Sequence, residues 1–148
     1  MLYGQEIKGV PDIIDGLKID EPSVFIPWEL SVEMLSTNMY EYQLSRVSNN
    51  YYTLRGARLF NALICNIGLH FNNVLKKIEF FRDDYSDLHK SFHDFQRVFE
   101  NVFGKPIMKE RVSDSFNSYE WVVGNKVKIR HYVIDRFGLT EYLYIECN

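Results

Sequence analysis

The sequence has few cysteines and no excess of positive charge, and each shortage excludes a class of protein. Cys65 and Cys147 are its only two cysteines. Two cysteines cannot build the disulfide framework of a small secreted domain, so we expect both to be reduced and buried in strands. The formal net charge is −3. Because a nucleic-acid-binding domain needs a basic surface, we expect no nucleic-acid partner.

Long apolar runs are also missing. No stretch approaches the roughly 18 uninterrupted apolar residues that a membrane-spanning helix requires. Residues 1–16 carry Glu6, Asp12 and Asp15, and they have neither the basic start nor the continuous apolar segment of a signal peptide. We therefore expect a cytoplasmic protein that has no membrane partner.

The motifs of common enzyme classes are absent as well. The sequence has no glycine-rich phosphate loop after a predicted strand and no G-x-S-x-G, and its carboxylates are scattered. His89 and His93 have the i, i+4 spacing that lets two imidazoles share a metal, but Lys90 stands where the HExxH motif needs a glutamate. No spacing indicates a third ligand. We expect no metal, no cofactor and no enzymatic activity.

Aromatic residues, by contrast, are abundant. They make up 16% of the chain, with ten Tyr and eleven Phe. Tyrosine combines an apolar ring with a polar hydroxyl, which suits a surface that contacts another molecule. A chain of 148 residues is long enough to bury about two thirds of its unfolded surface in one core. We predict a single domain, residues 1–148, with a tyrosine-rich binding surface.

Hydrophobic spacing predicts two helices among several strands. The stretch "SDLHKSFHDFQRVFENVFGKP" has apolar residues at helical intervals, with Ser86 as a possible cap and Gly104 at the end. These apolar residues are Leu88, Phe92, Phe95, Phe99 and Val102. A shorter helix is predicted after Ser31. The remaining apolar stretches are separated by turn residues and predict strands.

The predicted elements repeat. Two successive αβββ units cover about residues 28–82 and 86–148, and Gly56 and Gly124 then occupy equivalent hairpin turns. Glycine suits such a turn because a tight hairpin needs positive φ. The predicted fold class is α+β, in which two αβββ units form one antiparallel sheet with both helices on one face. The other face of the sheet is then open.

In this order of elements, the chain resembles the tandem α/β repeats of β-lactamase inhibitor proteins and of small bacterial immunity-type proteins. In those families a concave sheet binds another protein. The resemblance implies a non-enzymatic protein-interaction module of the immunity or inhibitor type, which binds a partner protein through its open sheet face. No motif is shared at the level of residues, so the resemblance assigns no site residue.

The alternation of the last two strands predicts which side chains face outward. Val127, Ile129, His131 and Val133 have one parity, and pairing Val133 with Ile145 would join the apolar sets of both strands on the helix side. The candidate partner-binding residues have the opposite parity: Arg130, Tyr132, Arg136, Tyr142 and Tyr144. Tyrosine and arginine are frequent at binding hot spots. An alternative is that they only stabilise an exposed sheet as cross-strand pairs.

A second hypothesis is a small ligand-binding domain or enzyme with a histidine-containing pocket between sheet and helices. Its candidates are His89, His93 and His131. Catalysis at His131, with Cys147 as a predicted neighbour, would need an acidic residue that orients the imidazole, such as Glu146 or Asp135.

Overall fold

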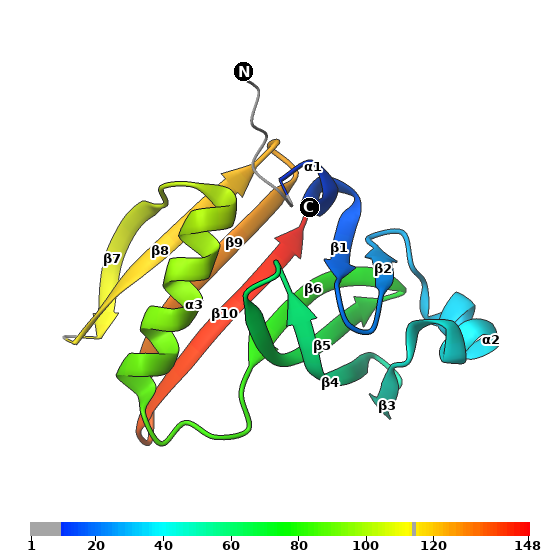
Figure 1. Ribbon diagram of the computed structural model, residues 1–148, viewed down its shortest axis with the longest axis horizontal. Helices are drawn as coiled ribbons and strands as arrows, with labels where there is room; N and C mark the ends of the chain where they lie inside the picture. The colour runs from blue at the N-terminus through cyan, green and yellow to red at the C-terminus, as the bar shows by residue number, and fades with distance from the viewer. Residues whose placement is uncertain (1–9, 114) are drawn as a thin grey trace.

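The computed structural model describes residues 10–113 and 115–148, and its main feature is an eight-stranded antiparallel sheet (Figure 1). Across the sheet, the strands are β3 (Ser45–Ser48), β4 (Tyr51–Leu59), β5 (Leu63–Asn72), β6 (Val74–Phe81), β10 (Leu139–Cys147), β9 (Val127–Asp135), β8 (Phe116–Val123) and β7 (Ile107–Ser113). The chain thus contributes two runs of four consecutive strands. The last strands of the two runs, β6 and β10, lie side by side at the centre.

Three helices and a small hairpin complete the described part of the chain. These elements are α1 (Val10–Asp15), β1 (Gly16–Ile19), β2 (Val24–Pro27), α2 (Val32–Tyr42) and α3 (Leu88–Phe103). Strands β1 and β2 form a separate two-stranded sheet. The hairpin is joined to β4 by a hydrogen bond from the Asp20 amide to the Arg58 carbonyl, 2.9 Å long.

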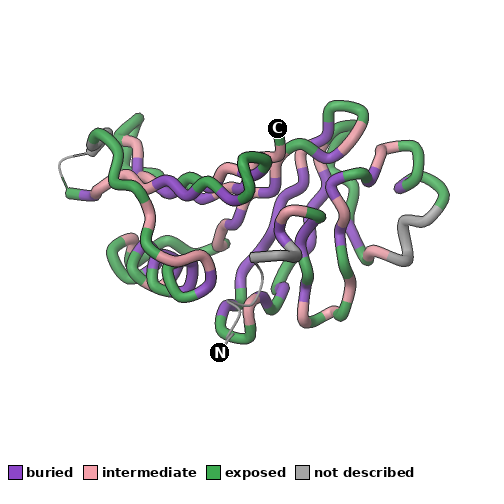
Figure 2. Tube along the Cα trace, turned by 90° about the horizontal axis from the view of Figure 1, so that it is seen from above, coloured by how far each residue is buried: buried purple, intermediate pink, exposed green. Residues whose placement is uncertain are grey.

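Helix α3 packs on one side of the large sheet, over β8 and β9 (Figure 1). Its first turn is capped by Asp87, whose side chain accepts a hydrogen bond from the Lys90 amide. Phe99 is fully buried, and its ring lies 5.3 Å from that of Phe80 in β6 and 6.1 Å from that of Trp121 in β8. The helix therefore contacts both runs of strands, and Figure 2 shows it on one side of the sheet only.

The predicted α+β class, with two helices on one face of two αβββ units, is wrong. The protein is mostly β, and each run has four strands rather than three. Helix α2 lies beside β2, away from the face that α3 covers (Figure 1). Of the α2 side chains that the structure describes, only that of Leu35 is buried. The β1–β2 hairpin packs on the first run instead, where Leu17, Ile19 and Ile26 are buried.

Gly56 does not form a hairpin turn. It lies inside β4, where the pairing with β5 shifts register between Leu54 and Ala57, and its φ is 68°. This is a β-bulge, and the Gly56 amide donates to Oδ1 of Asn66 over 2.9 Å. The prediction failed because a bulge and a tight turn both favour a residue with positive φ. Gly124 does lie in the turn between β8 and β9.

Candidate functional site

The predicted outward side chains of β9 and β10 form a cluster on the side of the sheet opposite α3. We call Arg130, Tyr132, Tyr142 and Tyr144 the tyrosine face. Tyr132 pairs with Tyr142, and Arg130 with Tyr144, across the two strands. The Tyr132 ring lies 5.5 Å from that of Tyr142 and 6.1 Å from that of Tyr144. Among the described residues, no helix or strand covers this surface (Figure 2).

Arg130 is held in place by two neighbours, whereas Arg136 stands apart. One guanidinium nitrogen of Arg130 donates to the Tyr144 hydroxyl at 3.4 Å, and another donates to Glu120 at 3.3 Å. The bond to Tyr144, followed by that to Glu120, raises the pKa of Arg130. Arg136 is exposed in the turn after β9, where its amide donates to the Gly138 carbonyl. The structure therefore brings four of the five predicted residues together.

A buried carboxylate organises positive charge beside the tyrosine face. The Glu120 side chain is only 7% exposed, and it lies 3.2 Å from the ammonium of Lys109 and 3.8 Å from that of Lys128. Burial acts to raise the pKa of Glu120, but the bond and charge of Lys109, with the neighbouring cations, outweigh it, so the pKa lies below its ordinary value. With Arg130, three cations surround one carboxylate. The surroundings of Glu120 are therefore positive.

A second polar cluster continues the same surface onto β4, β5 and β6. Tyr51 donates to Oε1 of Glu79 at 2.8 Å, and Nε2 of His70 lies 2.9 Å from the same oxygen. Burial raises the pKa of Tyr51, whereas the bonds from His70 and Tyr51 lower the pKa of Glu79 despite its burial. Gly68 leaves room for the contact between Tyr51 and Glu79, since a Cβ at this position would lie 2.5 Å from the Tyr51 hydroxyl oxygen.

Sequence reasoning missed this cluster. The available signal was a glycine inside an apolar strand, which often marks a close approach of neighbouring groups. Glu79 also pairs with Tyr144 across β6 and β10. The cluster therefore adjoins the tyrosine face directly.

Strands β6 and β10 separate beyond this point. Only three residue pairs join them, ending at Glu79 with Tyr144, although β10 stays paired with β9 as far as Leu139. The opening contains a cavity of about 350 Å³, which we call the fork cavity. Its lining includes Lys77, Glu79, Phe81, Tyr132, Tyr142 and Tyr144.

A buried polar network lies on the α3 side of the fork. His131 is fully buried, and its Nε2 lies 2.6 Å from a carboxylate oxygen of Glu141, whose other oxygen accepts from the Ser91 hydroxyl at 2.7 Å. Burial lowers the pKa of His131, more than the bond to Glu141 raises it. On the other side of the ring, Nδ1 lies 2.7 Å from the side-chain oxygen of Gln96, whose NH2 group donates to a carboxylate oxygen of Glu100 at 2.7 Å.

This network cannot act as a serine–histidine catalytic pair. The Ser91 hydroxyl donates to a carboxylate and not to the imidazole, so His131 is not placed to take its proton. The acidic residue that contacts the imidazole is Glu141, and not Asp135 or Glu146 as predicted. His131 pairs with Leu143 across the strands, whereas Cys147 pairs with Val127.

The network instead connects the two runs of strands. Arg82, directly after β6, donates from Nε to the Ser91 hydroxyl at 2.9 Å, and its guanidinium carbon lies 4.2 Å from the centre of the Phe95 ring. Ser91 in α3 donates in turn to Glu141 in β10. This Arg82–Ser91–Glu141 bridge spans the fork where the strand pairing is missing.

The remaining histidines and cysteines lie apart from each other. His89 stacks on Phe116 with ring centres 4.6 Å apart, and His93 is exposed. Among the described residues, no group of three or more His, Cys, Asp or Glu side chains is arranged to hold a metal. Cys65 is buried, which raises its thiol pKa to about 12, and Cys147 is half-buried. A thiol with such a high pKa is a poor nucleophile.

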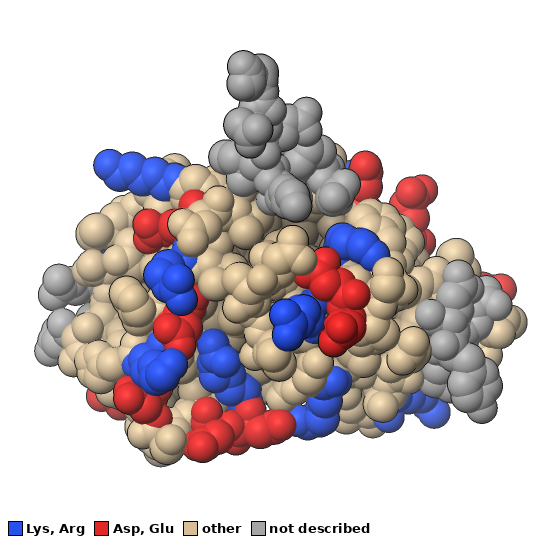
Figure 3. Space-filling view, viewed as in Figure 1, with Lys and Arg blue, Asp and Glu red and all other residues tan. Residues whose placement is uncertain are grey.

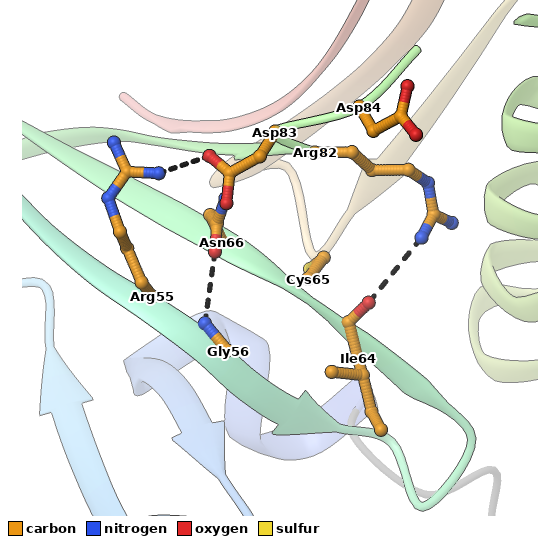
Figure 4. A pocket seen from close by; sticks show the side chains of 8 residues that line it. All are labelled: Arg55, Gly56, Ile64, Cys65, Asn66, Arg82, Asp83 and Asp84. Carbon is orange, nitrogen blue, oxygen red and sulfur yellow. Dashed lines mark hydrogen bonds and ion pairs between the residues drawn. The ribbon is translucent and has the colours of Figure 1, made fainter. Parts of the chain in front are cut away.

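A second cavity, of about 550 Å³, lies beside the bulge at Gly56 (Figure 4). Arg55 forms an ion pair with Asp83, and Arg82 donates to the Ile64 carbonyl at 3.4 Å. The arginines are thus already engaged by groups of the protein itself. Figure 3, which shows the α3 side of the molecule, has acidic and basic side chains interspersed and no field of one sign. The tyrosine face is therefore the stronger candidate.

No protein-family model, no curated protein and no solved structure matches this chain. The resemblance to β-lactamase inhibitor and immunity-type proteins therefore stays a prediction. In the part of the chain that the structure describes, no helix combines the length and the apolar character needed to cross a bilayer.

Proposed function

We propose that this protein is a non-enzymatic interaction module of the immunity or inhibitor type, which acts in the cytoplasm and binds a partner protein through the tyrosine face. The observation that carries the proposal is the placement of three tyrosines and Arg130 on adjacent central strands, on the uncovered side of the sheet. Tyrosine and arginine anchors supply much of the binding energy in protein interfaces. The pairing of β9 with β10 fixes the backbone of these four residues, which limits the entropy lost on binding.

The alternative of a histidine-containing pocket has no comparable support. Three surface cavities of the described part have linings without histidine. His131 is fully buried between α3 and the sheet, and the Phe92 ring stacks on it with centres 3.8 Å apart. A substrate would have to displace this ring to reach the imidazole. The geometry therefore favours the binding module.

The test is affinity capture from a lysate of the source organism with three forms of the protein. The wild type and Arg97→Ala, a control on the exposed side of α3, should capture the same stoichiometric protein partner. A Tyr132→Ala/Tyr144→Ala variant should lose it, because each anchor can contribute about 2 kcal/mol, or about thirtyfold in affinity. Equal capture by all three forms, at equal thermal stability, would refute the proposal.

A further inference from the structure

We infer that the fork cavity receives a basic side chain, lysine or arginine, of the partner protein. The inference rests on the proposed function, because Tyr132, Tyr142 and Tyr144 of the tyrosine face line the cavity. A partner segment that covers these rings would therefore pass over the mouth of the cavity. The volume of about 350 Å³ is large enough for one long side chain.

The aromatic walls of the cavity suit a cation. The rings of Tyr132 and Tyr144 are nearly perpendicular, at 86°, with centres 6.1 Å apart. Aromatic faces set at an angle attract ammonium and guanidinium groups through the negative potential above each ring. Lys77 already exploits this property, since its ammonium lies 5.0 Å from the centre of the Tyr144 ring. The protein's own lysine thus acts as a model for the incoming group.

The carboxylates around the cavity favour the same charge. Both oxygens of Glu141 are bonded, to Ser91 and to His131. In Glu79, by contrast, Oε1 accepts both hydrogen bonds and none among the described residues uses Oε2. The low pKa of Glu79 keeps this group ionised at neutral pH. Glu79 is therefore the residue that would pair with an incoming cation.

Charge beside the cavity also defines what should flank the basic residue. Lys109, Lys128 and Arg130 surround Glu120 on the neighbouring strands. A partner segment that places its basic residue in the fork would bring its adjacent residues over these cations. We therefore expect an acidic residue next to the basic one in the partner.

The experiment is an NMR titration of the intact protein with Nα-acetyl-arginine methylamide, with the uncharged citrulline analogue as the matched probe. The arginine probe should shift the amide signals of Phe81, Tyr142 and Tyr144 in a saturable manner, and the citrulline probe should not. Glu79→Gln, which keeps a hydrogen-bond acceptor for Tyr51, should weaken binding by up to about fivefold, because an exposed charge pair contributes at most about 1 kcal/mol. Lys77→Ala should strengthen binding, because it removes a competing cation.

Opposite effects of the two substitutions, in proteins with wild-type melting temperatures, would support the inference. Absence of a saturable shift in both the wild type and Lys77→Ala, or equal affinities in wild type and Glu79→Gln, would overturn it. Capture of the partner would still report on the tyrosine face, so this failure leaves the proposed function standing. Conversely, the probe could bind while the Tyr132→Ala/Tyr144→Ala variant captures the partner as well as the wild type does. That result would refute both the proposed function and the assignment of the cation to a partner.

Discussion

Replacing Glu141 tests how the two runs of strands are held together. The side chain of Glu141 is only 2% exposed, and it accepts hydrogen bonds from Ser91 at 2.7 Å and from His131 at 2.6 Å. We compare Glu141→Ala, which removes both acceptors, with Glu141→Gln, which keeps the shape. In the glutamine variant, the amide oxygen can accept from Ser91 while its NH2 group donates to His131. The imidazole then carries its hydrogen on Nδ1 and donates to the Gln96 oxygen.

The two substitutions should differ several-fold in their effect on stability. Glu141→Ala removes the acceptor of the buried Ser91 hydroxyl and the partner of His131 Nε2, at about 1 to 3 kcal/mol each, and it also creates a cavity. The release of a buried carboxylate offsets part of this cost, so we expect a loss of about 3 to 5 kcal/mol, as for other broken buried pairs. Glu141→Gln keeps every hydrogen bond and should cost about 1 kcal/mol.

Urea unfolding at pH 7.5, followed by tryptophan fluorescence and by circular dichroism, measures both values. Equal m-values would show that the change lies in stability and not in compactness. A Glu141→Ala protein as stable as the wild type would mean that the bridge adds nothing to the fold. Equal losses in the alanine and glutamine variants would refute the hydrogen-bond assignment.

Three further predictions concern pH, the tyrosine face and Gly68. Because burial lowers the pKa of His131, the folded protein resists a proton that the unfolded chain accepts, so stability should fall below about pH 6.5 by up to 1.4 kcal/mol per pH unit; His131→Asn should remove this slope in urea titrations between pH 7.5 and 5.5. Tyr132→Ala and Tyr144→Ala should each cost about 1 kcal/mol or less in thermal melts, as exposed cross-strand pairs do, and unfolding of either variant would contradict the face assignment. Gly68→Ala should separate Tyr51 from Glu79, because its Cβ would lie 2.7 Å from Oε1 of Glu79; an unchanged pH titration of the Tyr51 ring signals would show otherwise.

Strand parity could be read from the sequence, but strand partners could not. Val127, Ile129 and Val133 are buried as predicted, and Tyr132 and Tyr142 share the opposite face. The predicted pairing of Val133 with Ile145 was nevertheless wrong, because Val133 pairs with Glu141. A shift by an even number of residues keeps every side chain on its face and changes every partner. The acidic partner of His131 was missed for this reason.

Helical periodicity was a stronger signal than the turn residues between the strands. The spacing from Leu88 to Val102 correctly predicted α3, because an amphipathic helix on a sheet needs one continuous apolar stripe. Strand β7 was missed, since its Ile107 and Met108 are exposed and do not alternate with buried residues. The fork between β6 and β10 depends on how far a long-range pairing extends. No local pattern encodes that distance.

The strand order has a consequence for how the chain folds. Each pairing within β3–β6 and within β7–β10 joins strands that are consecutive in the sequence, so these hairpins close short loops. The β6–β10 pairing alone in the large sheet joins strands that are distant in the sequence, with α3 and three strands between them. Such distant contacts form slowly. We expect the hairpins of each run to form first. The β6–β10 pairing should form last, when α3 brings Ser91 between Arg82 and Glu141.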